Sequence, residues 1–201
     1  MPTPERLALL ASLLRRAIRE SAPGIGLSCA SVCLGSLIAL ELPPKLQSPI
    51  FGLSYGLGGF LLARAPARAL GSGVQRLLAP VMSAFGCAYA GWIFTILMAA
   101  EGTRFELTLG SSWFWLQGGA IASGGFVGRG RALLVPLLGA LGFALAGALG
   151  RMTLDLLASL GSTVTGVVLA PVAIFLIGGA LLAAASNTTR RVTAENPARS
   201  S

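Results

Sequence analysis

The sequence predicts an all-α integral membrane protein, a bundle of six transmembrane helices built from three two-helix hairpin repeats and preceded by an N-terminal interfacial amphipathic helix. Three observations lead to this prediction: an apolar composition, a series of long apolar segments, and a motif that recurs along the chain. Of the 201 residues, 54% are hydrophobic and only 11% are charged, whereas soluble domains carry about 25% charged residues. So much apolar surface favours a lipid environment over water. The apolar segments leave no soluble domain that could hold an active site, so we expect no enzymatic activity.

Residues 1–22 predict a helix that lies on the membrane surface. Thr3, Pro4 and Glu5 have the order of an N-cap, a first-turn proline and a first-turn acid. Apolar residues then recur at helical spacing opposite Arg15 and Arg19; they are Leu7, Leu10, Leu14 and Ile18. The apolar stretch precedes the basic residues, which is the reverse of a signal peptide.

Six apolar segments follow, and together they predict a transmembrane domain over residues 23–186. A helix needs about 20 residues to cross the hydrocarbon core. The segments lie near residues 24–42, 47–63, 78–100, 110–128, 132–150 and 164–186. Residues 187–201 are polar and predict a disordered cytoplasmic tail.

The basic residues between the segments predict the orientation. If successive segments cross the membrane in opposite directions, 12 of the 15 Lys and Arg residues fall on one side of it. The other side has only Lys45, Arg104 and Arg151. The Arg-rich side is expected in the cytoplasm, with both termini, which requires an even number of crossings. The net charge of +8 therefore reflects membrane orientation and not nucleic-acid binding, because no basic stripe with stacking aromatics is present.

A motif in the even-numbered segments indicates an internal repeat. An aromatic residue is followed, after two positions, by a Gly-Gly pair, and the motif recurs at 60-residue intervals. The predicted repeats span about 23–76, 77–131 and 132–186, and each has two crossings, so they are parallel and related by an axis along the membrane normal. The motifs begin at Tyr55, Trp115 and Phe175, and the pairs are Gly58 and Gly59, Gly118 and Gly119, and Gly178 and Gly179.

The glycine pairs have two interpretations. Small residues let helices approach closely in lipid, so the pairs are first expected to be packing positions. The alternative is that the three Gly-Gly faces converge on the pseudo-threefold axis and line a path for a solute.

Ionisable residues near the ends of the segments are the next candidates. Glu41, Glu101 and Asp155 each fall near the outer end of an odd-numbered segment. One acid per repeat would form a ring at an external mouth that favours cations. The alternative is interfacial pairing with the basic neighbours of these acids, which are Lys45, Arg104 and Arg151.

Few other side chains offer chemistry. Gln117 is the only amide in the interior of a segment and would bind a solute or pigment, or else bond a neighbouring helix. Cys29 and Cys33 are four residues apart and share a helix face, as a metal or redox pair would, although small packing residues explain them better. The chain has no histidine, and we expect neither a metal site nor a cofactor.

Two functions from different classes are consistent with these patterns. The first is a small-solute transporter or channel subunit that works near the repeat axis. The second is a non-catalytic membrane scaffold or assembly subunit that packs its Gly and Ala faces against a larger complex or a second copy. The expected partners are the lipid bilayer and other membrane proteins.

Overall fold

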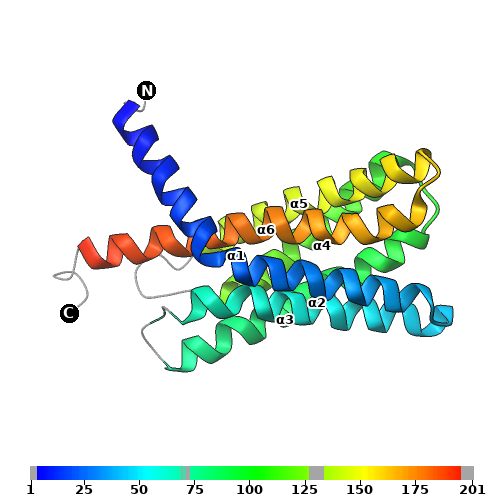
Figure 1. The fold of residues 1–201 in the computed structure, drawn as a ribbon, viewed down its shortest axis with the longest axis horizontal. Coiled ribbons are helices and arrows are strands. Elements are labelled where there is room, and N and C mark those ends of the chain that lie inside the picture. Colours follow the sequence, from blue (N-terminus) through cyan, green and yellow to red (C-terminus); the bar gives the residue numbers. More distant parts are fainter. Residues whose placement is uncertain (1–3, 69, 71–72, 127–133, 196–201) are drawn as a thin grey trace.

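The computed structural model describes residues 4–68, 70, 73–126 and 134–195, and the elements in this part of the chain are all helices (Figure 1). The helices are α1 (Pro4–Leu40), α2 (Pro44–Ala67), α3 (Gly73–Ala99), α4 (Arg104–Gly124), α5 (Leu134–Ser159) and α6 (Thr163–Glu195). The predicted all-α class is confirmed, and each helix contains most of one predicted apolar segment.

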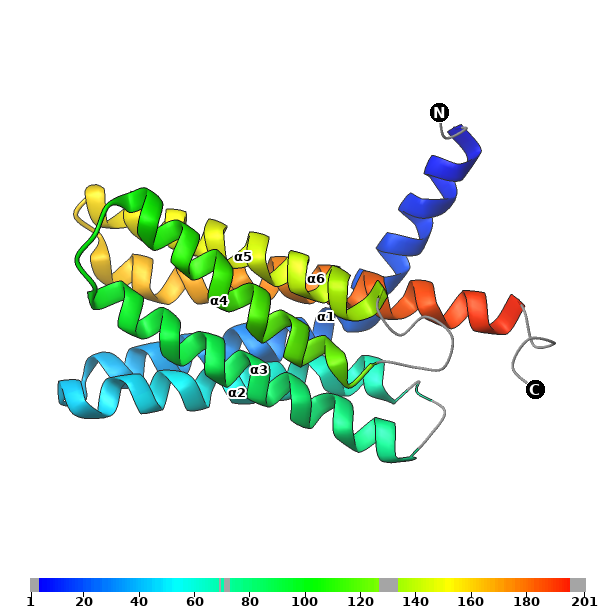
Figure 2. The ribbon, with the colours of Figure 1, turned by 180° about the vertical axis from the view of Figure 1, so that it is seen from behind.

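The helices form a closed ring in which each one packs against its neighbours in sequence and α6 packs against α1. Successive helices run in opposite directions, so that α1, α3 and α5 point one way and α2, α4 and α6 the other (Figures 1 and 2). The connections α1–α2, α3–α4 and α5–α6 therefore meet at one end of the bundle. The N-terminal part of α1 and the C-terminal part of α6 extend beyond the other end.

Four of the described helical segments are long and apolar enough to cross a membrane by length and composition; the six crossings expected from the sequence stay a prediction. The four segments are Arg19–Leu40, Gly73–Ala99, Val135–Ser159 and Thr163–Ala183. The helices α2 and α4 do not qualify on composition, because glycine, serine and amide residues dilute their apolar content. Examples are Ser54, Gly56, Ser111 and Gln117.

Two helices extend further than the sequence suggested. The helix α1 runs without interruption through Pro23, and its first part leaves the bundle at an angle (Figure 1), as expected of a helix bent at a proline. The helix α6 continues to Glu195, although a disordered tail was predicted from residue 187. No proline or glycine interrupts it before Pro197, so nothing local ends the helix earlier. The interfacial position of residues 1–22 stays a prediction.

Local signals set the ends of two helices at the far end of the bundle. Thr103 caps α4, since its side chain accepts from the Glu106 N–H at 3.3 Å while the Glu106 carboxylate accepts from the Thr103 N–H at 3.0 Å. The helix α5 ends in a Schellman motif, in which Gly161 has a φ of +78° and the Ser162 N–H donates to Leu157 O at 2.8 Å. Only glycine takes this left-handed conformation without strain.

Large apolar side chains cover the outside of the bundle. Soluble proteins rarely expose such extensive apolar surface, because their contiguous apolar patches are small. Those more than half exposed include Leu53, Phe85, Leu109, Leu141 and Leu160. An exterior of this kind is compatible with lipid as the surrounding medium.

A candidate functional site on the axis of the helix ring

The three aromatic residues that open the repeated motif meet at the centre of the ring. Tyr55, Trp115 and Phe175 come from α2, α4 and α6, and each is completely buried. The ring centroids lie 5.6 Å apart for Tyr55 and Trp115, 5.8 Å for Tyr55 and Phe175, and 6.4 Å for Trp115 and Phe175. These are favourable distances for aromatic pairs. The sequence placed one aromatic in each motif, but it could not show that the three touch; we name them the axial aromatic cluster.

Glycines on the neighbouring helices make room for the axial aromatic cluster. A Cβ atom added at Gly91 would lie 2.6 Å from Tyr55 Cβ, and one at Gly147 would lie 2.7 Å from Trp115 Cβ. A methyl group at either position would overlap the base of the aromatic side chain. The glycines of α3 and α5 therefore let the rings of α2 and α4 lie directly against helix backbone.

Two members of the axial aromatic cluster carry polar atoms without partners. Within the described part of the chain, neither Tyr55 Oη nor Trp115 Nε1 has a hydrogen-bond partner. Such atoms are rare in native interiors, and each one needs an explanation. A buried donor left unpaired costs about 1–3 kcal/mol, so the centre of this bundle carries a polar cost that apolar rings of the same shape would avoid.

The predicted Gly-Gly pairs are buried between helices. A Cβ atom at Gly59 would lie 2.8 Å from Cys87 Cβ on α3, and one at Gly119 would lie 2.7 Å from Phe143 Cβ on α5. The pair on α6 is as close, because a Cβ atom at Gly179 would meet Leu62 Cδ1 at 2.7 Å. The remaining members are equally enclosed, namely Gly58 beside Phe175, Gly118 beside Ala90 and Gly178 beside Phe143. In this structure the pairs are packing positions, and a solute path along them stays a prediction.

Gln117 bonds a neighbouring helix. Its side-chain oxygen accepts a hydrogen bond of 2.8 Å from the hydroxyl of Tyr89 on α3. The ring of Tyr89 also packs edge-on against Phe114, with centroids 6.3 Å apart. Of the two uses considered for this amide, the structure contains the bond between helices.

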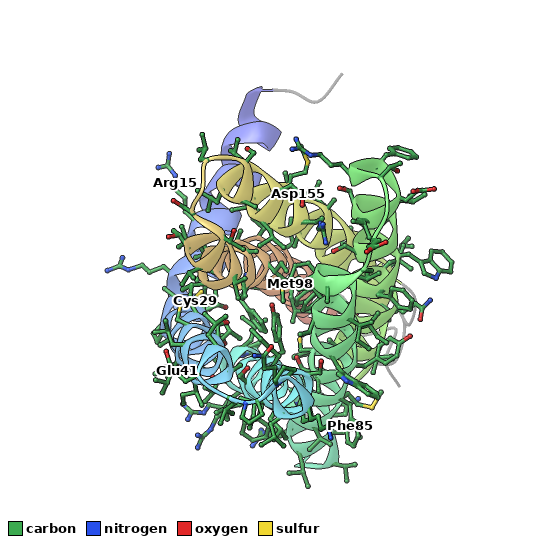
Figure 3. All side chains as sticks on the ribbon, turned by 90° about the vertical axis from the view of Figure 1, so that its right-hand side faces the viewer. Arg15, Cys29, Glu41, Phe85, Met98 and Asp155 are labelled. Carbon is green, nitrogen blue, oxygen red and sulfur yellow. The ribbon has the colours of Figure 1, made fainter. Side chains whose placement is uncertain are left out.

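The three acidic candidates lie at the same end of the bundle but in different surroundings. Glu41 and Glu101 are exposed in the α1–α2 and α3–α4 connections, whereas Asp155 is within α5 and pairs with Arg151 at 2.9 Å. Figure 3 looks onto this end and labels Glu41 and Asp155 on different sides of it. The Asp155 pairing matches the alternative that the sequence left open, and a ring of three acids stays a prediction.

Arg151 has a structural role that the sequence did not reveal. Its side chain is 8% exposed, and one guanidinium nitrogen donates a 2.8 Å hydrogen bond to Leu97 O. That carbonyl belongs to the last turn of α3, where the helix dipole favours a cation. Arg151 thus ties α5 to the end of α3 while Asp155 neutralises it. The signal available in the sequence was the i,i+4 pair, but not the contact between helices.

Cysteines and acids do not gather into a metal site in the described residues, where no three side chains of the ligating types are grouped. Cys29 and Cys33 are half-buried free thiols, and the Cys29 sulfur lies 3.9 Å from Val172 O on α6. This contact joins α1 to α6 and fits the packing interpretation of the pair.

The arrangement is compatible with a multi-pass helical membrane protein, by the length and composition of its helices. Comparison of the chain with protein-family models, curated proteins and solved structures finds no match. What the protein does must therefore be inferred from its own residues.

Proposed function

We propose that the chain crosses the membrane six times, with both termini in the cytoplasm. The helices α1, α3 and α5 all point the same way, and each contains a segment able to span a bilayer. A chain that crosses twice in one direction must return in between, and among the described helices α2 connects α1 to α3 and α4 connects α3 to α5. Burial against their neighbours would compensate for the lower apolar content of α2 and α4.

The charges support this orientation. Five exposed arginines lie toward the end of the bundle that carries the termini, and they are Arg15, Arg19, Arg64, Arg68 and Arg76. The opposite end carries Lys45 and Arg104 on its surface. An excess of arginine on one side is typical of the cytoplasmic face.

We further propose that the three hairpins are copies of one ancestral unit. Equivalent positions make equivalent contacts: Gly91 packs on Tyr55 as Gly147 packs on Trp115. The same spacing relates the contact of Gly59 with Cys87 to that of Gly119 with Phe143, so the correspondence extends over about one turn of each helix. The contacts of α1 with α6 follow it less closely, because a Cβ atom at Gly179 would meet Leu62 of α2 as well as Ile25 of α1.

The function that the geometry supports best is a small-solute transporter or channel subunit. The observation that carries this proposal is the axial aromatic cluster, in which each hairpin contributes one ring and two rings carry unpartnered polar atoms. A bundle that served only as a packing unit would gain stability from apolar residues there. The rings fill the axis, so this conformation is closed, and transport requires the hairpins to move apart or the rings to rotate.

Reconstitution tests the proposal. Purified protein in liposomes should increase the permeability to small solutes above that of protein-free vesicles. Single cysteine labels placed in the chain after Cys29, Cys33 and Cys87 are replaced by alanine should report residue 70 and both termini on one face, and Gly102 on the other. Equal permeability of loaded and empty vesicles would reject transport, and labelling of the two termini from opposite faces would reject six crossings.

A membrane scaffold is the second candidate, and one observation favours it. Ala22, Gly26 and Ala30 are exposed at four-residue intervals on α1, and apart from the surrounding backbone of α1 itself nothing lies within 4 Å of the position that a Gly26 Cβ would occupy. Such a stripe allows a further helix to pack closely. Replacement of Gly26 by leucine should then release a partner that co-purifies with the wild-type chain in mild detergent. Retention of the same partner by G26L would reject this docking face.

A further inference from the structure

We propose that Trp115 Nε1 and Tyr55 Oη form hydrogen bonds with a small uncharged solute at the axial aromatic cluster. This inference rests on the proposed transport function and names its substrate class. Its starting point is that two neighbouring rings, with centroids 5.6 Å apart, both carry polar atoms that are buried and, among the described residues, unpartnered.

The chemistry of the two groups defines what they bind. An indole nitrogen only donates a hydrogen bond, and a phenol hydroxyl donates or accepts one. The solute must therefore present an acceptor to Trp115, and an oxygen of a carbonyl, amide or alcohol meets this requirement. A polar solute that pairs both groups removes the cost of leaving them desolvated.

The charge pattern excludes ions from this site. The sequence has no Asp, Glu, Lys or Arg between Glu20 and Glu41 in α1, between Lys45 and Arg64 in α2, or between Arg76 and Glu101 in α3. The same holds between Glu106 and Arg129, between Arg131 and Arg151, and between Asp155 and Arg190. An ion at mid-depth would have no countercharge and would be strongly disfavoured.

Ring stacking also limits the access of a cation to the Trp115 indole. The Phe143 ring stacks on Trp115 with an interplanar angle of 13° and a centroid distance of 5.8 Å, and Phe175 meets Trp115 edge-on at 84°. The Phe143 ring therefore covers one face of the indole, from which a cation would otherwise contact it. Trp115 Nε1 and Tyr55 Oη are therefore the groups that would recognise the solute.

Stopped-flow light scattering of proteoliposomes tests the inference with urea and glycerol as probes, and with sucrose shrinkage as the measure of water permeability. W115F and Y55F keep the rings but remove one polar atom each. Y89F is the matched control, because it removes a phenol hydroxyl that already has Gln117 as its partner. We expect W115F and Y55F each to slow urea or glycerol entry about three- to tenfold, as loss of one hydrogen bond would, while Y89F matches the wild type.

A second readout follows the site itself. In a protein with Trp92 and Trp113 replaced by phenylalanine, the exchange of the Trp115 indole N–H with D₂O is measured by ¹⁵N NMR in nanodiscs. Exchange within minutes, slowed by glycerol, is the expected result for a site that receives water and solute. Protection for days would overturn the inference whatever the fluxes are.

The outcomes separate the two proposals. Solute entry that is equal in wild type, W115F and Y55F overturns the site and leaves transport standing. Faster sucrose-driven shrinkage without urea or glycerol entry identifies water as the uncharged solute, provided that W115F reduces it. Rapid indole exchange in a protein that moves neither water nor solute supports the site but rejects the transport function.

Discussion

The replacement of Gly119 by alanine tests whether the glycine pairs are packing positions. Gly119 lies on α4 and faces α5, where an added Cβ atom would be 2.7 Å from both Gly139 O and Phe143 Cβ. Carbon atoms pack best at about 3.5–4.0 Å, so the two helices must separate by roughly 1 Å. Neither contacting atom lies at the end of a flexible side chain, so the strain cannot be relieved by a change of rotamer.

The size of the effect follows from two opposing terms. Overpacking of this kind costs about 1–3 kcal/mol, and alanine in place of glycine returns up to about 1 kcal/mol through helix propensity. Gly26→Ala is the matched control, since it makes the same change within α1 where no atom lies within 4 Å. The propensity gain is common to both variants, so the difference between them isolates the packing cost, about 1–3 kcal/mol.

Reversible unfolding in mixed micelles, with SDS as denaturant and helix content as the signal, measures both variants. We expect Gly119→Ala to be less stable than the wild type and Gly26→Ala to be equal or more stable. If the two variants unfold at the same SDS fraction, the contact between α4 and α5 at Gly119 is not as tight as described, and the packing interpretation of the Gly-Gly pairs is wrong.

Two further predictions concern the end of the bundle away from the termini. Arg151→Leu should cost about 3 kcal/mol of unfolding free energy, because it leaves Asp155 unpaired in a largely buried place; Arg151→Leu combined with Asp155→Leu should recover part of this in the same assay, and additive losses would argue against the pair. The hydrogen bonds from Thr103 lower the pKa of Glu106 below its ordinary value. The N-terminus of α4 is therefore stabilised above that ordinary pKa, and the stabilisation is lost as pH falls through the lowered value. The protection factors of the first-turn amides of α4, which are exchange rates corrected for their intrinsic pH dependence, should fall on acidification in the wild type but not in Glu106→Gln, and the same fall in both would refute this role.

Composition and periodicity were enough to predict the helical class and the approximate position of every helix. Long apolar runs of this kind can satisfy their backbone hydrogen bonds in lipid as helices, so each run predicted one helix. Their ends were predicted less well. The helix α1 runs through Pro23 and α6 continues past residue 187, because a proline bends a helix that packing supports and a polar segment stays helical when nothing interrupts it.

The sequence by itself also identified the aromatic and Gly-Gly motif, since a recurrence at fixed spacing is visible without coordinates. Only the tertiary structure decided what the motif does. It brings Tyr55, Trp115 and Phe175 into contact, turns the glycines toward neighbouring helices, and joins Arg151 to Leu97 O. Contacts of this kind depend on the rotation of each helix about its own axis. Glycine and leucine on several faces of a helix leave that rotation open, and it is settled only when all six helices pack together.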